Sequence, residues 1–327
     1  MITRRRIIVA LGAGALAPLA SFAQQQSAKV YRIGFLGPST GAGTATRMEA
    51  MRAGLRELGY QEGRNVVYEY RWADNNNERL PELAAELVRL KVDVLMTGGT
   101  PGTRAAKQAT TTIPIVMVHS GDAVAMGLIA SLARPGGNIT GTTFFDPELS
   151  AKRLELLKEI MPRIRRVAVL MNPRNPVIAP ILRAMGATAE YLKLKLEKFE
   201  VQRPGELAGA IAAMAKSRVD AVAITQDALL TENAKVISDL AVKQRLPAIG
   251  YTELAEAGGL IGYGVNVLEL YRRSAYFVDR ILKGAKPGDI PVEHPTRFEL
   301  VINLKTAKAL GIKIPQSLLQ RADKVIE

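Results

Sequence analysis

The sequence predicts an α/β protein made of two similar, doubly wound Rossmann-like lobes. Short β-rich runs alternate with helical patterns, and this alternation occurs twice along the chain. The chain of 327 residues is also too long for one compact domain of ~100–150 residues. With 48% hydrophobic and 23% charged residues it can bury a core, which excludes a disordered or collagen-like chain.

The first half contains four predicted strands separated by helices. We expect strands over residues 31–36, 66–72, 92–96 and 115–119, and helices over residues 46–58, 80–90 and 103–109. Strands and helices that alternate in this way form parallel sheets covered by helices on both faces.

Three segments of the first half recur in the second half in the same order. RIGFLGP at residues 32–38 resembles RVAVLMNP at 166–173, KVDV at 91–94 resembles RVDA at 218–221, and TIPI at 112–115 resembles RLPA at 245–248. Each match is weak alone because hydrophobic strands look alike. Three matches at nearly constant spacing predict two similar lobes.

The C-terminal part does not continue the repeat. We expect a strand over residues 260–264, a helix over 268–282, a Pro/Gly-rich turn at 284–288, a strand over 298–303 and two short helices. A chain that returns to the first lobe and crosses again makes a multi-crossing hinge. The expected boundaries are residues 28–143 and 265–294 for lobe 1, and residues 144–264 and 295–327 for lobe 2.

Residues 1–23 are typical of an export signal. Arg4, Arg5 and Arg6 form a basic start, residues 7–20 are apolar, and a small-x-small cleavage site ends at Ala23. The paired arginines also suit the twin-arginine route, so Sec and Tat export both stay open. No later stretch is long and apolar enough for a membrane helix, and the chain has no cysteine for a lipid anchor. We therefore expect a soluble periplasmic protein, cleaved near Ala23.

Composition excludes several kinds of chemistry. Without cysteine there is no disulfide, thiolate metal site or cysteine nucleophile, and two histidines, His119 and His294, argue against a multi-histidine metal centre. The net charge of +13 would suit an anionic partner, although a solvated basic surface is its simplest explanation. No helix-turn-helix or basic-aromatic array indicates nucleic-acid binding.

Catalytic and cofactor motifs are also missing. Gly34, Gly37 and Gly41 do not have the G-x-G-x-x-G spacing of a dinucleotide site, and residues 119–122 contain triad residue types without a G-x-S-x-G elbow. Residues 74–78 look calcium-like but lack EF-hand spacing, so a polar loop is the better interpretation. We expect no cofactor, no metal and no enzymatic activity.

In parallel sheets of this kind, ligands bind at the carboxyl ends of the strands. The repeat therefore predicts which loops face a ligand. They are residues 37–43, 97–103 and 120–124 in lobe 1, and residues 172–177, 225–229 and 251–253 in lobe 2.

The segment Gly98 to Thr103 is the most informative of these loops. We expect Thr100 to cap a helix and Pro101 to occupy its first turn. The free amides at such a helix start can hold a carboxylate without a charged side chain. The alternative is a well-capped helix that binds nothing.

Polar residues follow other predicted strands. Asp122, Asp227 or Glu253 could complement an ammonium group, and Asn172 and Asn175 could supply amide donors and acceptors. The alternatives are helix capping for the acidic residues and turn formation for the asparagines.

Two tyrosines complete the candidate set. Tyr251 and Tyr263 could stack on a flat ligand, although core packing is the commoner role of tyrosine. The full set of candidate binding residues is Ser39, Thr40, Gly99, Thr100, Pro101, Gly102, Thr103, Ser120, Asp122, Asn172, Asn175, Asp227, Tyr251 and Tyr263.

The mature chain resembles the solute-binding proteins of ABC importers, in the family of the tryptophan- and tyrosine-type binding proteins. The motifs are Gly-Thr-Pro at residues 99–101, AAKQAT at 105–110, IPIV at 113–116, GDAV at 121–124, LARPGGNITG at 132–141, ILKGAKP at 281–287 and NLKTAKALG at 303–311. Together they are specific to the family, and less specific for a ligand.

The resemblance implies a type I periplasmic-binding fold with three crossings between the lobes. It implies that the helix start at Thr100 to Thr103 holds a ligand carboxylate, and that the Asn-rich turn falls on Asn172 and Asn175. The family's Asp-Pro-Val loop is Asp122-Ala123-Val124 here, and loss of the proline leaves this loop freer.

We expect the protein to capture a small carboxylate-bearing solute, amino-acid-like and with an aromatic side chain as one option, and to deliver it to an ABC permease. We expect it to be a monomer. Two alternatives stay open: an exported α/β enzyme that acts on a small acid, and a ligand-sensing module for a membrane receptor.

Overall fold

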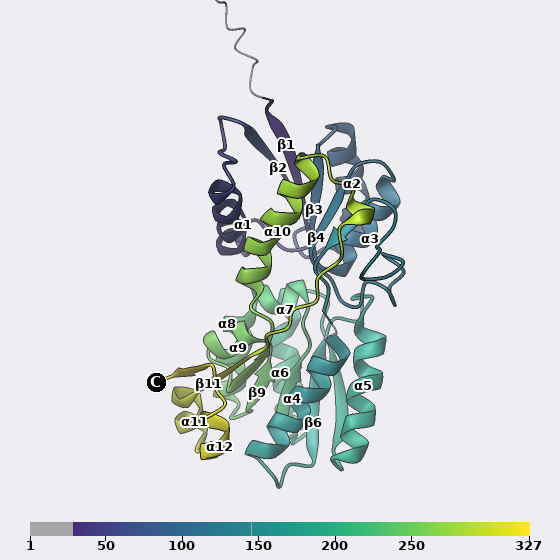
Figure 1. Cartoon of the computed structure of the whole chain (residues 1–327). Helices are drawn as coiled ribbons and strands as arrows, with labels where there is room; N and C mark the ends of the chain where they lie inside the picture. The colour runs from purple at the N-terminus through teal and green to yellow at the C-terminus, as the bar shows by residue number, and fades with distance from the viewer. Residues whose placement is uncertain (1–28, 145) are drawn as a thin grey trace, which may run out of the picture.

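The computed structural model describes residues 29–144 and 146–327 as two α/β lobes (Figure 1). The predicted signal, residues 1–23, lies outside the described residues. In the described part of the chain, no helix combines the length and apolar character needed to cross a bilayer. The α/β prediction with two parallel-sheet lobes is confirmed.

Lobe 1 is built on a five-stranded parallel sheet in the order β2-β1-β3-β4-β5. The strands are β1 (Tyr31–Gly37), β2 (Val66–Trp72), β3 (Val94–Gly98), β4 (Ile115–His119) and β5 (Ile139–Gly141). The helices are α1 (Ala45–Glu57), η1 (Asn77–Arg79), α2 (Leu80–Arg89), α3 (Gly99–Ala109), α10 (Val267–Leu282) and η3 (Pro287–Asp289).

Alternating side chains of the strands bury both faces of this sheet. Ile33 and Phe35 of β1 pack with α1 and α10, whereas Leu36 packs with α2 and α3 on the opposite face. The helix α10 therefore belongs to lobe 1 although it follows most of lobe 2 in the sequence (Figure 1).

Lobe 2 is built on a seven-stranded sheet in the order β12-β11-β10-β9-β8-β6-β7, in which β11 runs antiparallel to β10 and parallel to β12. The strands are β6 (Arg166–Met171), β7 (Lys195–Glu200), β8 (Ala221–Ile224), β9 (Ala248–Gly250), β10 (Ile261–Gly264), β11 (Glu299–Asn303) and β12 (Lys324–Ile326). The helices are α4 (Asp146–Ile160), α5 (Ile178–Tyr191), η2 (Pro204–Glu206), α6 (Leu207–Lys216), α7 (Ala228–Glu232), α8 (Ala234–Lys243), α9 (Thr252–Glu256), α11 (Leu304–Leu310) and α12 (Gln316–Leu319).

The chain passes between the two sheets three times. It crosses between β5 and α4, between β10 and α10, and between η3 and β11. These connections place the carboxyl ends of the parallel strands of both lobes toward the middle of the molecule (Figure 1).

The sequence prediction gave no residues for β5, β7 or β12 and shifted other strands. Neither β5 nor β12 was expected, because three residues are too short to show a period of two. β3 begins two residues later than predicted and continues to Gly98, so the sheet reaches the helix start that follows it.

Candidate binding site between the lobes

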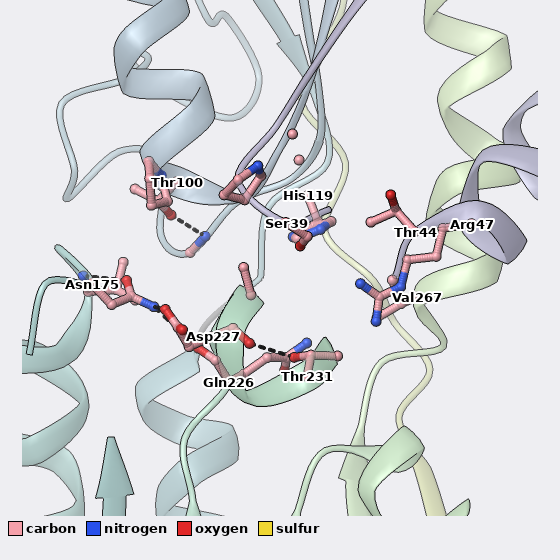
Figure 2. Close-up of a pocket in the computed structure, with 18 of the residues that line it drawn as sticks. Ser39, Thr44, Arg47, Thr100, His119, Asn175, Gln226, Asp227, Thr231 and Val267 are labelled. Carbon is pink, nitrogen blue, oxygen red and sulfur yellow. Dashed lines mark hydrogen bonds between the residues drawn. The ribbon is translucent and has the colours of Figure 1, made fainter. Parts of the chain in front are cut away.

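A cavity lies between the lobes at the carboxyl ends of the strands. The space between its walls measures about 750 Å³, including the part open to solvent, which is in the range of small-molecule pockets. In Figure 2, Thr100 and Asn175 lie at one side of the cavity, and Thr44, Arg47 and Val267 lie at the opposite side. Both lobes therefore contact whatever the cavity holds.

The start of α3 forms one end of the lobe 1 wall. Gly98, Gly99, Thr100 and Pro101 all line the cavity. Gly99 has a φ of +76°, a left-handed conformation that favours glycine at this sharp entry into the helix. Amides of the first turn have no acceptor inside the helix, so this end of the cavity suits an anion.

The hydroxyl of Thr100 has a different role from the one that the sequence predicted. The N-cap of α3 is Gly98, in an extended conformation, so the expectation that Thr100 caps the helix is wrong. The Thr100 Oγ1 lies 3.1 Å from the Ser120 Oγ and accepts a hydrogen bond from the Gly121 amide at 3.0 Å. This buried bond ties the helix start to the loop after β4.

Aromatic rings form the rest of the lobe 1 wall. Phe35, His119, Phe144 and Tyr271 line the cavity, and the His119 ring centroid lies 5.9 Å from that of Tyr271 and 6.2 Å from that of Phe144. Gly98 makes room for this cluster, since a Cβ at that position would lie 3.0 Å from the Tyr271 hydroxyl. This wall is suited to a flat, apolar ligand group.

His119 is neutral in this environment. Burial, aided by the positive charge of Arg47, lowers the pKa of His119 to about 3. Its ring makes no hydrogen bond to any other residue in the described ranges. His119 is thus part of the aromatic wall, with ring nitrogens that can still meet a ligand.

Lobe 2 supplies a buried carboxylate. Asp227, at the N-terminus of α7, accepts hydrogen bonds from the Asn172 Nδ2 at 3.2 Å, the Asn175 Nδ2 at 3.0 Å and the Leu229 amide at 3.0 Å. All three donors are neutral, and no basic side chain of the described residues forms an ion pair with Asp227. Burial raises the pKa of Asp227, although hydrogen bonds to its carboxylate oppose this shift.

A carboxylate held this way lacks a cation partner in the described part of the protein. Its charge is removed from water at a cost that neutral donors repay only in part. A ligand with a positive group next to Asp227 would complete the compensation. The site thus offers an anion-binding helix start, an aromatic wall and a cation-seeking carboxylate.

Arg47 of α1 also reaches the cavity, and the sequence analysis did not find it. Its Nη2 lies 3.2 Å from the Glu253 Oε1 of lobe 2, so it bridges the two lobes. No motif marks Arg47, because it lies within a helix where arginine is usually a solvent-facing residue.

Two further contacts join the lobes at the rim of the cavity. The Glu232 carboxylate at the end of α7 accepts hydrogen bonds from the Thr40 hydroxyl and, at 2.6 Å, from the Asn75 Nδ2. The Arg174 Nη1 lies 3.0 Å from the Glu78 Oε1. These contacts belong to a conformation in which the lobes are closed on each other.

Six of the fourteen predicted residues line the cavity, and eight do not. The six are Ser39, Gly99, Thr100, Pro101, Asn175 and Asp227. The other eight are Thr40, Gly102, Thr103, Ser120, Asp122, Asn172, Tyr251 and Tyr263. The cavity residues outside every predicted loop include Phe35, Thr44, Arg47, Phe144, Thr231 and Tyr271.

Several of the eight support the site from behind. Asn172 holds Asp227, Ser120 contacts Thr100, and the Thr103 Oγ1 lies 2.7 Å from the Thr97 Oγ1 inside the lobe. Thr40 contacts Glu232 at the rim. They are buried or half-buried neighbours of the cavity wall.

Both tyrosines lie away from the cavity. Tyr251 is buried in the core of lobe 2, where its hydroxyl donates to the Leu230 carbonyl at 2.7 Å, and Tyr263 packs against Phe298. Asp122 accepts a hydrogen bond from the Ala125 amide at 3.0 Å within its own turn. Core packing, the alternative from the sequence, describes both tyrosines, whereas Asp122 stabilises a turn and not the helix start that was its alternative.

Three relatives place this geometry among known proteins. The chain is 28% identical to a tyrosine-binding protein of Clostridioides difficile (strain R20291) over 79% of this chain and 74% of the relative. It is similar to a conserved domain protein from Vibrio cholerae O1 biovar El Tor strain N16961, with a TM-score of 0.84, 27% identity and coverage of 91% of this chain and 100% of that one.

A third relative is an ABC domain from Streptococcus pneumoniae in complex with L-Trp. Its TM-score is 0.81 at 26% identity, and the match covers 90% of this chain and 100% of that chain. These similarities confirm the predicted type I periplasmic-binding fold.

A family model described as "ABC transporter substrate binding protein" matches residues 37–326, nearly the whole described chain. Proteins of this family bind small-molecule solutes for ABC importers and work outside the cytoplasm. The resemblance predicted from the sequence motifs is confirmed, and the chain belongs to the ABC transporter substrate-binding protein family.

Proposed function

We propose that the protein binds an α-amino acid with an aromatic side chain between its lobes and delivers it to an ABC permease. The observation that carries this proposal is Asp227, a buried carboxylate at the cavity whose hydrogen-bond donors are all neutral. An ammonium group is the ligand feature that would compensate its charge.

The carboxylate of the ligand would lie at the start of α3. Thr100 and Asn175 lie at the same side of the cavity as Asp227 in Figure 2, which suits the short distance between the two charged groups of an amino acid. The helix dipole and the first-turn amides favour a negative charge there.

The aromatic side chain would lie against Phe35, His119 and Tyr271. Two relatives support this part of the proposal, since one is a tyrosine-binding protein and another was crystallised with L-Trp. A ring placed there would be enclosed by apolar and aromatic surface.

The transport role implies the oligomeric state, ligand release and docking partner of the protein. We propose that the protein acts as a monomer, releases its ligand unaltered and docks on an inner-membrane permease in its closed form. The expected N-terminal signal, cleaved near Ala23 after Sec or Tat export, is part of this proposal. So are the lobe boundaries at residues 143, 264 and 294, which the division of the strands between two sheets supports.

A ligand panel tests the proposal. Native mass spectrometry of the purified protein would identify any co-purified ligand, and thermal-shift titrations would compare L-Trp, L-Tyr and L-Phe with their deaminated and decarboxylated analogues. We expect stabilisation only by compounds that carry both charged groups. Equal stabilisation by the deaminated acids would contradict the role of Asp227, and recovery of a chemically changed ligand would indicate an enzyme.

A further inference from the structure

The end of lobe 2 that faces away from the cavity is strongly basic. We call this surface the basic pole. It consists of the loops that lead into β6, β7, β8 and β9, namely residues 161–166, 191–195, 216–220 and 243–247. These loops contain nine basic residues and one acidic residue. The composition alone does not show that the charges lie together.

The strand order brings the four loops side by side. Strands β9, β8, β6 and β7 are consecutive neighbours in the sheet. The Lys195 amide donates to the Arg165 carbonyl at 2.7 Å, and the Asp220 amide donates to the Arg166 carbonyl at 2.8 Å. At ~4.8 Å per strand, the four strand starts span roughly 14 Å. Neighbouring strand starts therefore lie within the distance over which charges interact at physiological salt, ~8 Å.

The basic side chains of the pole are exposed and almost unpaired. The exposed residues are Arg163, Arg165, Lys193, Lys195, Lys216, Arg218, Lys243 and Arg245. Among the described residues, only Lys195 of these eight has an acidic partner, Glu197 at 3.9 Å. Asp220, the one acidic residue of the loops, accepts from the Arg165 and Arg166 amides.

The corresponding end of lobe 1 lacks this excess. Residues 29–32, 60–64, 90–94 and 110–114, which lead into its strands, contain four basic and two acidic residues. There Asp93 pairs with Lys29 at 3.4 Å. The two lobes share a topology, so the fold alone does not require a basic end.

Favourable interaction with helix dipoles explains only part of the charge. Lys193, Arg218 and Arg245 follow the C-termini of α5, α6 and α8, where a cation is favourable. Lys216 and Lys243 add a second cation at two of these helix ends. Arg163 and Arg165 lie three and five residues beyond the end of α4.

An exposed aromatic ring lies in the same surface. Tyr191, the last residue of α5, is 84% exposed, more than any other large hydrophobic residue that the structure describes. Tyrosine next to basic side chains is typical of surfaces that lie at the membrane interface, where the ring enters the headgroup layer.

We propose that the basic pole binds the surface of an anionic phospholipid membrane, with Tyr191 in the headgroup layer. Basic clusters attract such membranes electrostatically, and an aromatic side chain adds an apolar contribution. Because the pole lies at the opposite end of lobe 2 from the cavity, the lobes remain free to open and close. Membrane association would raise the concentration of the protein near its transporter.

Vesicle co-sedimentation of the purified protein tests this. We expect binding to vesicles that contain phosphatidylglycerol, little binding to pure phosphatidylcholine vesicles, and loss of binding at ~0.5 M salt. A variant with Lys193, Lys216, Arg218 and Arg245 each changed to Glu should bind at least about 10-fold less. Tyr191→Ala should bind about 3-fold less.

The matched control reverses four exposed basic residues of lobe 1, namely Arg64, Arg89, Lys91 and Lys286, to Glu. It has the same net charge as the pole variant and should bind vesicles like the wild type. Equal losses in both variants would overturn the proposal in favour of a net-charge effect. The proposal would also be overturned if Tyr191→Ala bound vesicles as well as the wild type did and the wild-type protein bound soluble heparin as strongly as vesicles. Unchanged thermal unfolding and solute binding in every variant would separate this test from that of the cavity.

Discussion

The two lobes contribute differently to the cavity. Lobe 1 supplies the aromatic rings of Phe35, His119 and Tyr271 and the helix start at Thr100, whereas lobe 2 supplies the polar wall around Asp227. The lobes share a topology but not this chemistry. In the proposed function, lobe 1 would contact the ligand side chain, and lobe 2 would bind its positive group when the cleft closes.

The largest effect should come from the charge in lobe 2. In Asp227→Asn, the affinity for an amine-bearing ligand should fall roughly 100-fold, because loss of a buried charge partner costs about 3 kcal/mol. Isothermal titration calorimetry would measure it. The deaminated analogue is the matched control, since it does not interact with the Asp227 charge. If both ligands lose the same factor, Asp227 only caps α7 and shapes the loop.

A smaller effect should come from the apolar wall of lobe 1. Tyr271→Leu keeps an apolar side chain but removes the ring, so we expect about a 10-fold weaker affinity for an aromatic amino acid, or about 1.4 kcal/mol. The loss for an aliphatic amino acid should be less.

The control for this change is Tyr276→Leu on the same helix. Tyr276 is half-buried beneath the Arg273 guanidinium and does not line the cavity between the lobes. It should leave the affinity within about 2-fold of wild type. Equal losses at both positions would indicate a general weakening of α10 and would contradict selection by lobe 1.

A third effect concerns the contacts between the lobes. Glu232 contacts Thr40 and Asn75 across the rim but does not line the cavity, so Glu232→Gln should lower affinity only through the population of the closed form. We expect about a 5-fold loss of affinity. Calorimetry would measure the affinity, and the radius of gyration from solution scattering would report the population of the closed form. Glu78→Gln breaks an exposed pair with Arg174 and should cost less than about 2-fold.

Equal small effects of these two substitutions would mean that the ligand alone closes the cleft. A larger effect of Glu78→Gln would reverse the ranking and would show that the exposed pair controls closure.

Local patterns were sufficient to predict most of the fold. The period of the strands, the alternation with helices and the repeated segments each depend on residues near in sequence, so the two lobes follow from them. The three-residue strands β5 and β12 carry no such pattern, and only pairing with β4 and β11 defines them.

The candidate binding site was predicted only where it lies on loops or in the first turn of a helix. The rule that ligands meet the carboxyl ends of strands finds Ser39, Thr100, Asn175 and Asp227. The same rule wrongly includes Tyr251, since a residue after a strand can still turn its side chain into the core.

Cavity residues inside regular elements were missed. Phe35 lies within a strand and has the pattern of a core residue. Tyr271 lies on a helix far along the chain, and it reaches the cavity only because α10 crosses back to pack on lobe 1. Such long-range packing leaves no local signal in the sequence.

The smallest effect on affinity should come from a change of pH between 8 and 6. An ordinary histidine with a pKa of ~6.5 changes charge between pH 8 and pH 6, but His119 stays neutral there because burial lowers its pKa to about 3. We therefore expect the affinity to change less than about 2-fold over that range. At lower pH the affinity should fall as Asp227, whose pKa burial raises, becomes protonated. A stepwise change near pH 6.5 that His119→Phe abolishes would contradict the neutral wall.

Stability, unlike affinity, should already change as the pH falls through ~6.5. In the unfolded chain His119 has its ordinary pKa of ~6.5 and takes up a proton as the pH falls, whereas the folded protein does not. The folded state is therefore fully favoured above pH ~6.5, and its stability falls as the pH drops toward the folded pKa of about 3. His119→Phe should reduce the loss of thermal stability between pH 7 and pH 5, measured as unfolding midpoints of the ligand-free protein. Equal acid-induced losses in the wild type and in His119→Phe would mean that water reaches His119.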